Sequence, residues 1–167
     1  AEADESDQSF LLLQPSVSVI TNIEPDHLVN YENSFPNLKN AFLQFIKNLP
    51  FNGVSIVCGD DEVIKDLKIN FQRPHISYGF EMDNDFVLSD YESSGAQSYF
   101  KITSDSGSVD LNLNMLGKHN ALNAAAATIL CLQEGISIEV IQESLIGFMG
   151  IDRRMQILGE HTVNDHS

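Results

Sequence analysis

Residues 15–28 read PSVSVITNIEPDHL, in which a run of β-branched residues passes directly into an acidic loop. The β-branched run is typical of a strand in an α/β sheet. Glu24, Asp26 and His27 follow within four positions, and such side chains bind metals or transfer protons. Ligands of open α/β sheets bind at the carboxyl ends of strands. The stretch predicts an α/β fold with a candidate site at this strand end. The ordinary alternative is that His27 only caps a network of hydrogen bonds within the loop.

The segments that follow alternate between helical and strand patterns. Residues 37–49 have apolar side chains at helical spacing, and Pro50 marks the end of that pattern. Residues 53–59 and 75–80 are short apolar strands, and the acidic start of residues 60–67 suits a helix N-terminus. This alternation predicts a mostly parallel sheet flanked by helices.

The pattern changes between residues 86 and 115. Residues 99–103 (YFKIT) and 109–115 (VDLNLNM) flank the turn SDSG, which predicts an inserted antiparallel hairpin. Residues 120–135 are rich in alanine and stop at a glycine, and residues 137–148 follow with Ser137 as an N-cap. Two helices are therefore expected after the hairpin.

The charge balance restricts the partners. Nine basic residues face 24 acidic ones, for a net charge of −15, which argues against nucleic acid or an anionic membrane. Cys58 and Cys131 lie in apolar runs and predict buried free thiols in a reducing compartment. No signal peptide or membrane-spanning run is present in the sequence. The chain opens without methionine, so we expect a piece of a longer protein.

Three further clusters can carry chemistry, and each has an ordinary alternative. The opening AEADESD either supplies oxygen ligands for Mg²⁺ or is a solvated tail. Asn120 and Asn123 lie on one face of a helical turn, where an amide matches the adenine edge or simply caps the helix. Arg153 and Arg154 either hold ribose or phosphate or neutralise nearby acid.

Taken in order, AEADESD, TNIEPDHL, GKHNALNAAAA and RRMQILGE resemble the motifs of the Mur ligase family of peptidoglycan synthesis. The resemblance covers nearly the whole chain, up to Glu160, and the EADESD form is similar to the branch that joins L-alanine to UDP-N-acetylmuramate. It implies that residues 1–150 are the later part of the central ATP-binding domain. Residues 151–167 would be the junction and the start of the C-terminal amino-acid-binding domain.

The resemblance also implies the chemistry. In the family, the substrate carboxylate attacks the γ-phosphate of ATP, and the amino acid then attacks the acyl phosphate, with Mg²⁺ neutralising charge. The implied cofactors are ATP and Mg²⁺, and the setting is the bacterial cytoplasm, in cell-wall biogenesis, cell shape and division. By resemblance, Glu2 and His27 are the catalytic and metal-binding residues, and His119, Asn120, Asn123 and Arg154 bind ATP.

Two departures from the family pattern qualify this interpretation. A glycine-rich GxxGK[ST] phosphate loop is absent, so we expect the chain alone to be inactive. Phe42 stands where several relatives carry a modified lysine. Two rivals remain open, namely a non-catalytic acidic module that binds a nucleotide or a partner, and a metal-dependent hydrolase that uses Asp26 and His27.

Overall fold

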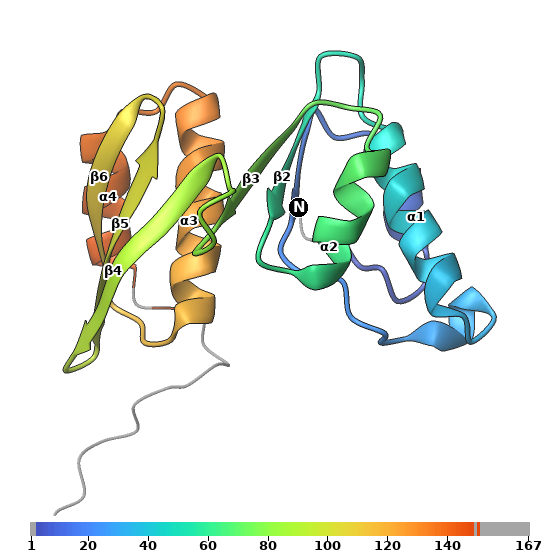
Figure 1. The fold of residues 1–167 in the computed structure, drawn as a ribbon, viewed down its shortest axis with the longest axis horizontal. Coiled ribbons are helices and arrows are strands. Elements are labelled where there is room, and N and C mark those ends of the chain that lie inside the picture. The colour runs from blue at the N-terminus through green and yellow to red at the C-terminus, as the bar shows by residue number, and fades with distance from the viewer. Residues whose placement is uncertain (1–2, 149, 151–167) are drawn as a thin grey trace, which may run out of the picture.

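The computed structural model describes residues 3–148 and residue 150, and its centre is a six-stranded sheet (Figure 1). The strands follow chain order, and β1 to β4 pair in parallel whereas β4, β5 and β6 pair antiparallel. This architecture confirms the predicted mostly parallel α/β sheet with an antiparallel insertion. The strands are β1 Val17–Ile20, β2 Val54–Cys58, β3 His75–Gly79, β4 Phe86–Ser94, β5 Gln97–Ser104 and β6 Gly107–Leu113.

The helices lie beside the two parts of the sheet. Figure 1 shows α1 and α2 next to β1–β3, and α3 and α4 next to β4–β6. Within the chain, α3 also contacts β2 and β3, so it spans the junction between the two parts. The helices are α1 Phe35–Lys47, α2 Glu62–Leu67, α3 Lys118–Gln133 and α4 Ile138–Gly147, with short 3₁₀ turns η1 Ser9–Leu12, η2 Leu28–Tyr31 and η3 Lys68–Asn70.

The starting residue of α1 differs from the expected one, and the start of α4 lacks the expected cap. The α1 helix begins at Phe35 because the Ser34 side chain accepts the Asn37 N–H, which is a favourable N-cap. The α4 helix begins after Ser137, as predicted, but the Ser137 side chain makes no capping hydrogen bond. The predicted hairpin is β5–β6, and β4 adds a third antiparallel strand that the pattern did not single out.

The link between β3 and β4 sets the position of the hairpin. Only Tyr78 and Gly79 of β3 pair with β4, opposite Phe86 and Val87. The antiparallel strands therefore extend the sheet past the carboxyl end of β3. The linking loop, residues 80–85, folds back on β3 because Asp85 accepts hydrogen bonds from the N–H and the hydroxyl of Ser77, at 2.7 and 2.8 Å.

Both cysteines are free, as predicted, with Cys58 buried and Cys131 half-buried. Within the described part of the chain, no helix combines the length and the apolar character that a bilayer crossing requires.

Candidate functional site

Three strand-end loops and the start of α3 meet at the carboxyl edge of β1–β3. The loop after β1 approaches the loop after β2, because the Ile23 N–H lies 3.5 Å from Asp61 Oδ2. The loop after β2 holds the loop after β3, because Asp60 Oδ2 accepts the Phe80 N–H at 2.7 Å. Lys118, the first residue of α3, then places its Nζ 5.0 Å from the Phe80 ring centroid. This is the edge at which α/β sheets bind ligands.

His27 lies at this edge with an exposed side chain. Its backbone is left-handed (φ 55°, ψ 27°) and begins η2. Glu24 accepts a hydrogen bond from Asn22 Nδ2 at 3.0 Å, and the Asp26 N–H donates to the Glu24 carbonyl at 2.8 Å. Among the described residues, no hydrogen bond holds the imidazole. Capping by the His27 side chain, the ordinary alternative, is therefore not what the described structure shows.

The acidic N-terminal segment is docked against η2, beside His27. Asn30 Nδ2 donates to the Ser6 carbonyl at 2.7 Å, and the Tyr31 hydroxyl donates to the Glu5 carbonyl. Both donors lie in η2, only a few residues after His27. The segment is therefore exposed but held in place, which a freely solvated tail would not be. Glu2 itself lies outside the described residues.

The electrostatics of this corner favour carboxylates in their charged form. The pKa of Asp4 lies below its usual value, chiefly because Ser6 donates hydrogen bonds to it, and the nearby His27 charge acts in the same direction. Hydrogen bonds from Ser9 likewise lower the pKa of Asp7. Burial and the neighbouring acids raise the pKa of Tyr31. Charged oxygen donors at neutral pH are what a hard cation requires.

The side chains at this corner are of the types that bind Mg²⁺, but the described residues alone do not form a complete metal site. Carboxylates and one exposed imidazole share the corner, yet no three His, Cys, Asp or Glu side chains converge in residues 3–148 and 150. The rival hydrolase, which would use Asp26 and His27, therefore finds no third described ligand.

A cleft of about 840 Å³ runs along β1 to this corner. Glu5, Glu24 and Asp26 line its polar part, and it continues past the apolar side chain of Phe42. The Phe42 ring packs 5.3 Å from the Phe10 ring. Phe42 is therefore an apolar packing residue, and the modified lysine that the resemblance associates with this position is not present.

The first two turns of α3 carry the predicted adenine motif. Gly117 precedes it with φ 101°, and the His119 ring lies so close that a Cβ at Gly117 would be 2.6 Å from its Cε1. Asn120 Nδ2 donates to the Leu116 carbonyl at 2.7 Å. Asn123 is exposed, and its side-chain amide has no hydrogen-bond partner among the described residues. Asn120 thus bonds to the backbone just before the helix but does not cap it, because the N-cap residue is Gly117 and no side chain caps α3. The side-chain amide of Asn123 is free to donate and accept.

Both amides open into a groove of about 500 Å³ between α3, α4 and the end of β6. A volume of roughly 300 to 1,000 Å³ is typical of small-molecule sites. The remaining lining is largely apolar and includes Met115, Ala124 and Phe148. Such a groove suits a flat heterocycle whose polar edge faces an amide.

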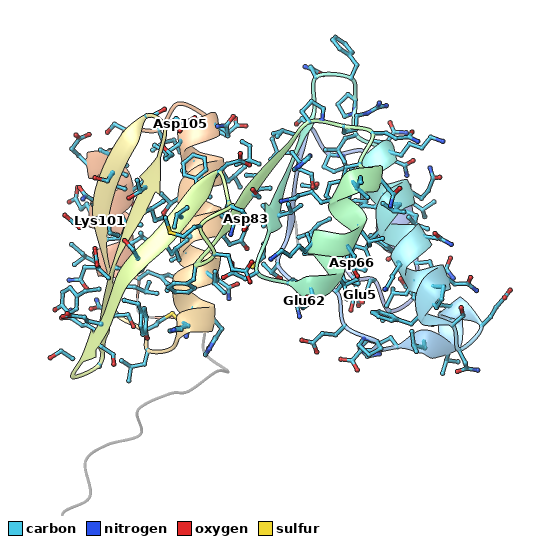
Figure 2. All side chains as sticks on the ribbon, viewed as in Figure 1. Glu5, Glu62, Asp66, Asp83, Lys101 and Asp105 are labelled. Atoms are coloured by element: carbon cyan, nitrogen blue, oxygen red, sulfur yellow. The ribbon has the colours of Figure 1, made fainter. Side chains whose placement is uncertain are left out.

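Asp60 and Asn84 are site residues that the pattern did not reveal. The Asp60 carboxylate accepts from Asn84 Nδ2 at 3.2 Å as well as from the backbone after β3. A Cβ at Gly59 would overlap Asn84 Oδ1, and a Cβ at Gly79 would overlap Asp60 Oδ1. The available signal was a glycine at each of two strand ends, one of them followed directly by aspartate. Figure 2 shows the same loop, marked by Asp83, between the β1–β3 part and the hairpin.

The remaining predicted residues, Arg153 and Arg154, lie outside the described residues, as does the proposed domain junction at 151–167.

Comparison with known proteins gives one family. A model described as the Mur ligase middle domain matches residues 2–131. A UDP-N-acetylmuramate–L-alanine ligase from Ruthia magnifica subsp. Calyptogena magnifica is 44% identical over 167 residues, which is 99% of this chain and 36% of that protein. The chain therefore spans about a third of the length of this relative.

Solved structures agree on the fold. MurC of Thermotoga maritima, a UDP-N-acetylmuramate–alanine ligase, superposes with a TM-score of 0.81 at 27% identity, covering 96% of this chain and 35% of that one. MurF of the same organism, solved in complex with ADP, superposes with a TM-score of 0.69 at 18% identity, covering 84% and 32%. The second likeness shows the fold alone.

Proposed function

The chain belongs to the Mur ligase family, as a middle domain, and on that premise we propose that it is the nucleotide-binding part of an ATP-dependent ligase that joins L-alanine to UDP-N-acetylmuramate. The observation that carries the proposal is a chain of contacts along the carboxyl edge of the sheet. It runs from the loop after β1, which leads to His27, through Asp61, Asp60 and Phe80 to Lys118 at the start of α3. The 44% identity to a ligase of this specificity supports the choice of substrates.

The adenine is proposed to lie in the groove beside Asn123. A free amide donates and accepts at once, as the N6 and N7 edge of adenine requires. Asn120 then acts mainly on the helix, through its hydrogen bond to Leu116. His119 and Arg154 complete the proposed nucleotide contacts, as the family resemblance implies.

The phosphates are proposed to point from this groove toward the His27 corner. The N-terminal end of a long helix carries a partial positive charge, and α3 has 16 residues. Lys118 adds a full charge there, and no described carboxylate lies within ion-pair distance of it. These features offset the strong negative charge of the chain at the point where an anion would bind.

The reaction is proposed to proceed in two steps. The sugar carboxylate attacks the γ-phosphorus, the bond to the β-phosphate oxygen breaks, and ADP leaves. The alanine amine then attacks the acyl carbon, loses a proton, and expels phosphate to form the amide. Mg²⁺, when bound, neutralises the phosphate charge, and Glu2 and His27 are its proposed ligands, with Glu24 and Asp26 around them.

The decisive experiment measures ADP release that depends on L-alanine. We expect it from the full-length parent ligase supplied with UDP-N-acetylmuramate, ATP and Mg²⁺, in the bacterial cytoplasm where peptidoglycan precursors are made. We expect none from the 167-residue chain alone, which spans 36% of the related ligase. ADP release that does not depend on L-alanine, or activity of the isolated chain, would contradict the proposal.

A further inference from the structure

The pairing of β4 with β5 contains a bulge at Asp90 and Tyr91. The register shifts between Ser89 and Glu92, so that these two residues together face the single residue Phe100. Asp90 is left-handed, with φ 53°, which is the conformation that the first residue of one bulge class adopts. Bulges of this kind re-aim a side chain, and they are frequent next to functional sites.

The bulge decides which side chain faces α3. In a regular strand Asp90 would share a face with the buried Leu88. The extra residue instead turns Asp90 to the opposite face, where its Oδ2 lies 3.3 Å from Lys101 Nζ. Tyr91 takes the α3-facing position. Figure 2 shows Lys101 on the hairpin, away from α1 and α2.

The Tyr91 hydroxyl holds the residue that starts α3. It accepts the Gly117 N–H at 3.0 Å and lies 3.2 Å from the Ser98 hydroxyl. Ser98 uses its only proton on the Met115 carbonyl, at 2.7 Å. The Tyr91 proton is therefore donated to Ser98, and every group in the chain of hydrogen bonds is satisfied.

The Tyr91 ring holds the same turn from another side. It meets the Phe80 ring edge-on, with centroids 6.2 Å apart and planes at 87°. Phe80 in turn lies under Lys118 Nζ, and its N–H is fixed by Asp60. One tyrosine thus joins the hairpin, the loop after β3 and the first turn of α3.

We propose that Tyr91 is a positioning residue for the nucleotide, which acts through Gly117 on the start of α3 and thereby on the position of Asn123 one turn further along the helix. Gly117 supplies no side-chain cap to α3, so the direction in which the helix starts depends on what holds the Gly117 peptide. Binding groups must be placed to within about 1 Å to keep their effect. This inference rests on the proposed adenine site.

The test is Tyr91→Phe in the full-length ligase, which removes one hydroxyl and keeps the ring. The KM for ATP should rise about three- to tenfold, the range that one hydrogen bond supplies. The kcat and the KM values for L-alanine and UDP-N-acetylmuramate should stay within about twofold, because none of these depends on the start of α3 in this proposal. Tyr99→Phe is the matched control, because among the described residues its hydroxyl bonds to Gln97 alone, on the same hairpin, and it should change none of these values.

Asn123→Ala distinguishes a failure of the proposed adenine site from a failure of the positioning role of Tyr91. If it leaves the KM for ATP unchanged, the adenine site itself is misplaced. If it raises the KM but Tyr91→Phe does not, the adenine site stands and the positioning role is wrong. If both raise it, the double variant should show less than the product of the two effects, because the residues act through one turn. A lowered melting temperature for Tyr91→Phe with an unchanged KM would also overturn the inference.

Discussion

The carboxylate of Asp60 lies 2.7 Å from the backbone nitrogen of Phe80, although the two residues are 20 positions apart in the chain. Asp60 also accepts the Glu81 N–H at 3.0 Å and the Asn84 amide at 3.2 Å. One side chain at the end of β2 thus shapes the whole loop after β3, and with it the surface beside α3.

Replacing Asp60 by Ala should lower the free energy of unfolding by about 1 to 3 kcal/mol, because the part-buried Phe80 N–H and the Asn84 amide lose their acceptor. Urea unfolding of the chain measures this. Asp66→Ala is the control, since Asp66 is exposed on α2 and its carboxylate has no hydrogen bond among the described residues. Equal stability of the two variants would show that Asp60 does not support the loop.

Gly59→Ala should destabilise the chain by about 1 to 3 kcal/mol through overpacking. The new Cβ would overlap Asn84 Oδ1. Asn84 cannot easily move away, because it is only 8% exposed and its amide donates hydrogen bonds to Asp60 and to the Glu81 carbonyl. Adding Asn84→Ala should restore part of the loss. Gly147→Ala in α4 is the control, because nothing lies within 4 Å of its Cβ position, and a helical alanine should be neutral or stabilising.

Tyr78→Phe should make the stability of the chain less sensitive to alkali. Burial raises the pKa of Tyr78 above its usual 10.0, so the folded state keeps the phenol protonated after the unfolded state has lost the proton. The contribution is complete below pH 10 and is lost as pH rises above it. The Tyr78 hydroxyl has no described hydrogen-bond partner, so at pH 7 the variant should be as stable as the parent chain or more so.

Urea midpoints at pH 7 and between pH 9.5 and 11 test the Tyr78 prediction. Burial also raises the pKa of Cys58, so Cys58 too makes the chain less stable as the pH rises. The Tyr78→Phe variant should therefore still lose some stability in alkali. Tyr99→Phe, at an exposed position, should follow the parent chain at every pH. A parallel fall for Tyr78→Phe would refute the prediction.

Asn120→Ala and Asn123→Ala should differ in kind. The first removes the hydrogen bond to the Leu116 carbonyl and should lower stability by about 1 kcal/mol. The second should leave stability within about 0.5 kcal/mol, as at other exposed positions, while raising the KM of the full-length ligase for ATP more than the KM for L-alanine. Melting curves combined with ATP kinetics distinguish the two, and identical profiles would contradict the division of roles.

Substituting His27 or Glu2 by Ala in the full-length ligase should raise the Mg²⁺ concentration needed for half-maximal rate by about tenfold or more, the loss of metal affinity expected when a supporting group is removed. An Mg²⁺ titration of the initial rate measures it. Asp105→Asn removes one negative charge at the far turn of the hairpin (Figure 2) and should leave the titration unchanged. An unchanged requirement after His27→Ala would mark His27 as structural.

Much of the fold followed from patterns that lie within a few residues of each other. The strands up to β3, the two late helices and the β5–β6 hairpin all have local signals of period, turn and cap. Strand β4 was not predicted, because its second half is polar and contains the bulge at Asp90 and Tyr91. A bulge shifts the alternation by one residue, so no strict period-2 pattern survives it.

The candidate site divides in the same way. By itself, the sequence determined the family and the two motifs that meet at the sheet edge, because His27 and the α3 turn sit in recognisable local strings. Only the structure decided that the Asn120 amide bonds to the Leu116 carbonyl while the Asn123 amide is free, and that the acidic N-terminus docks on η2. It also decided that Asp60 and Tyr91 support the edge. Apart from the local bond of Asn120, each of these contacts joins residues 20 or more positions apart. No local pattern encodes which distant backbone group a side chain will meet.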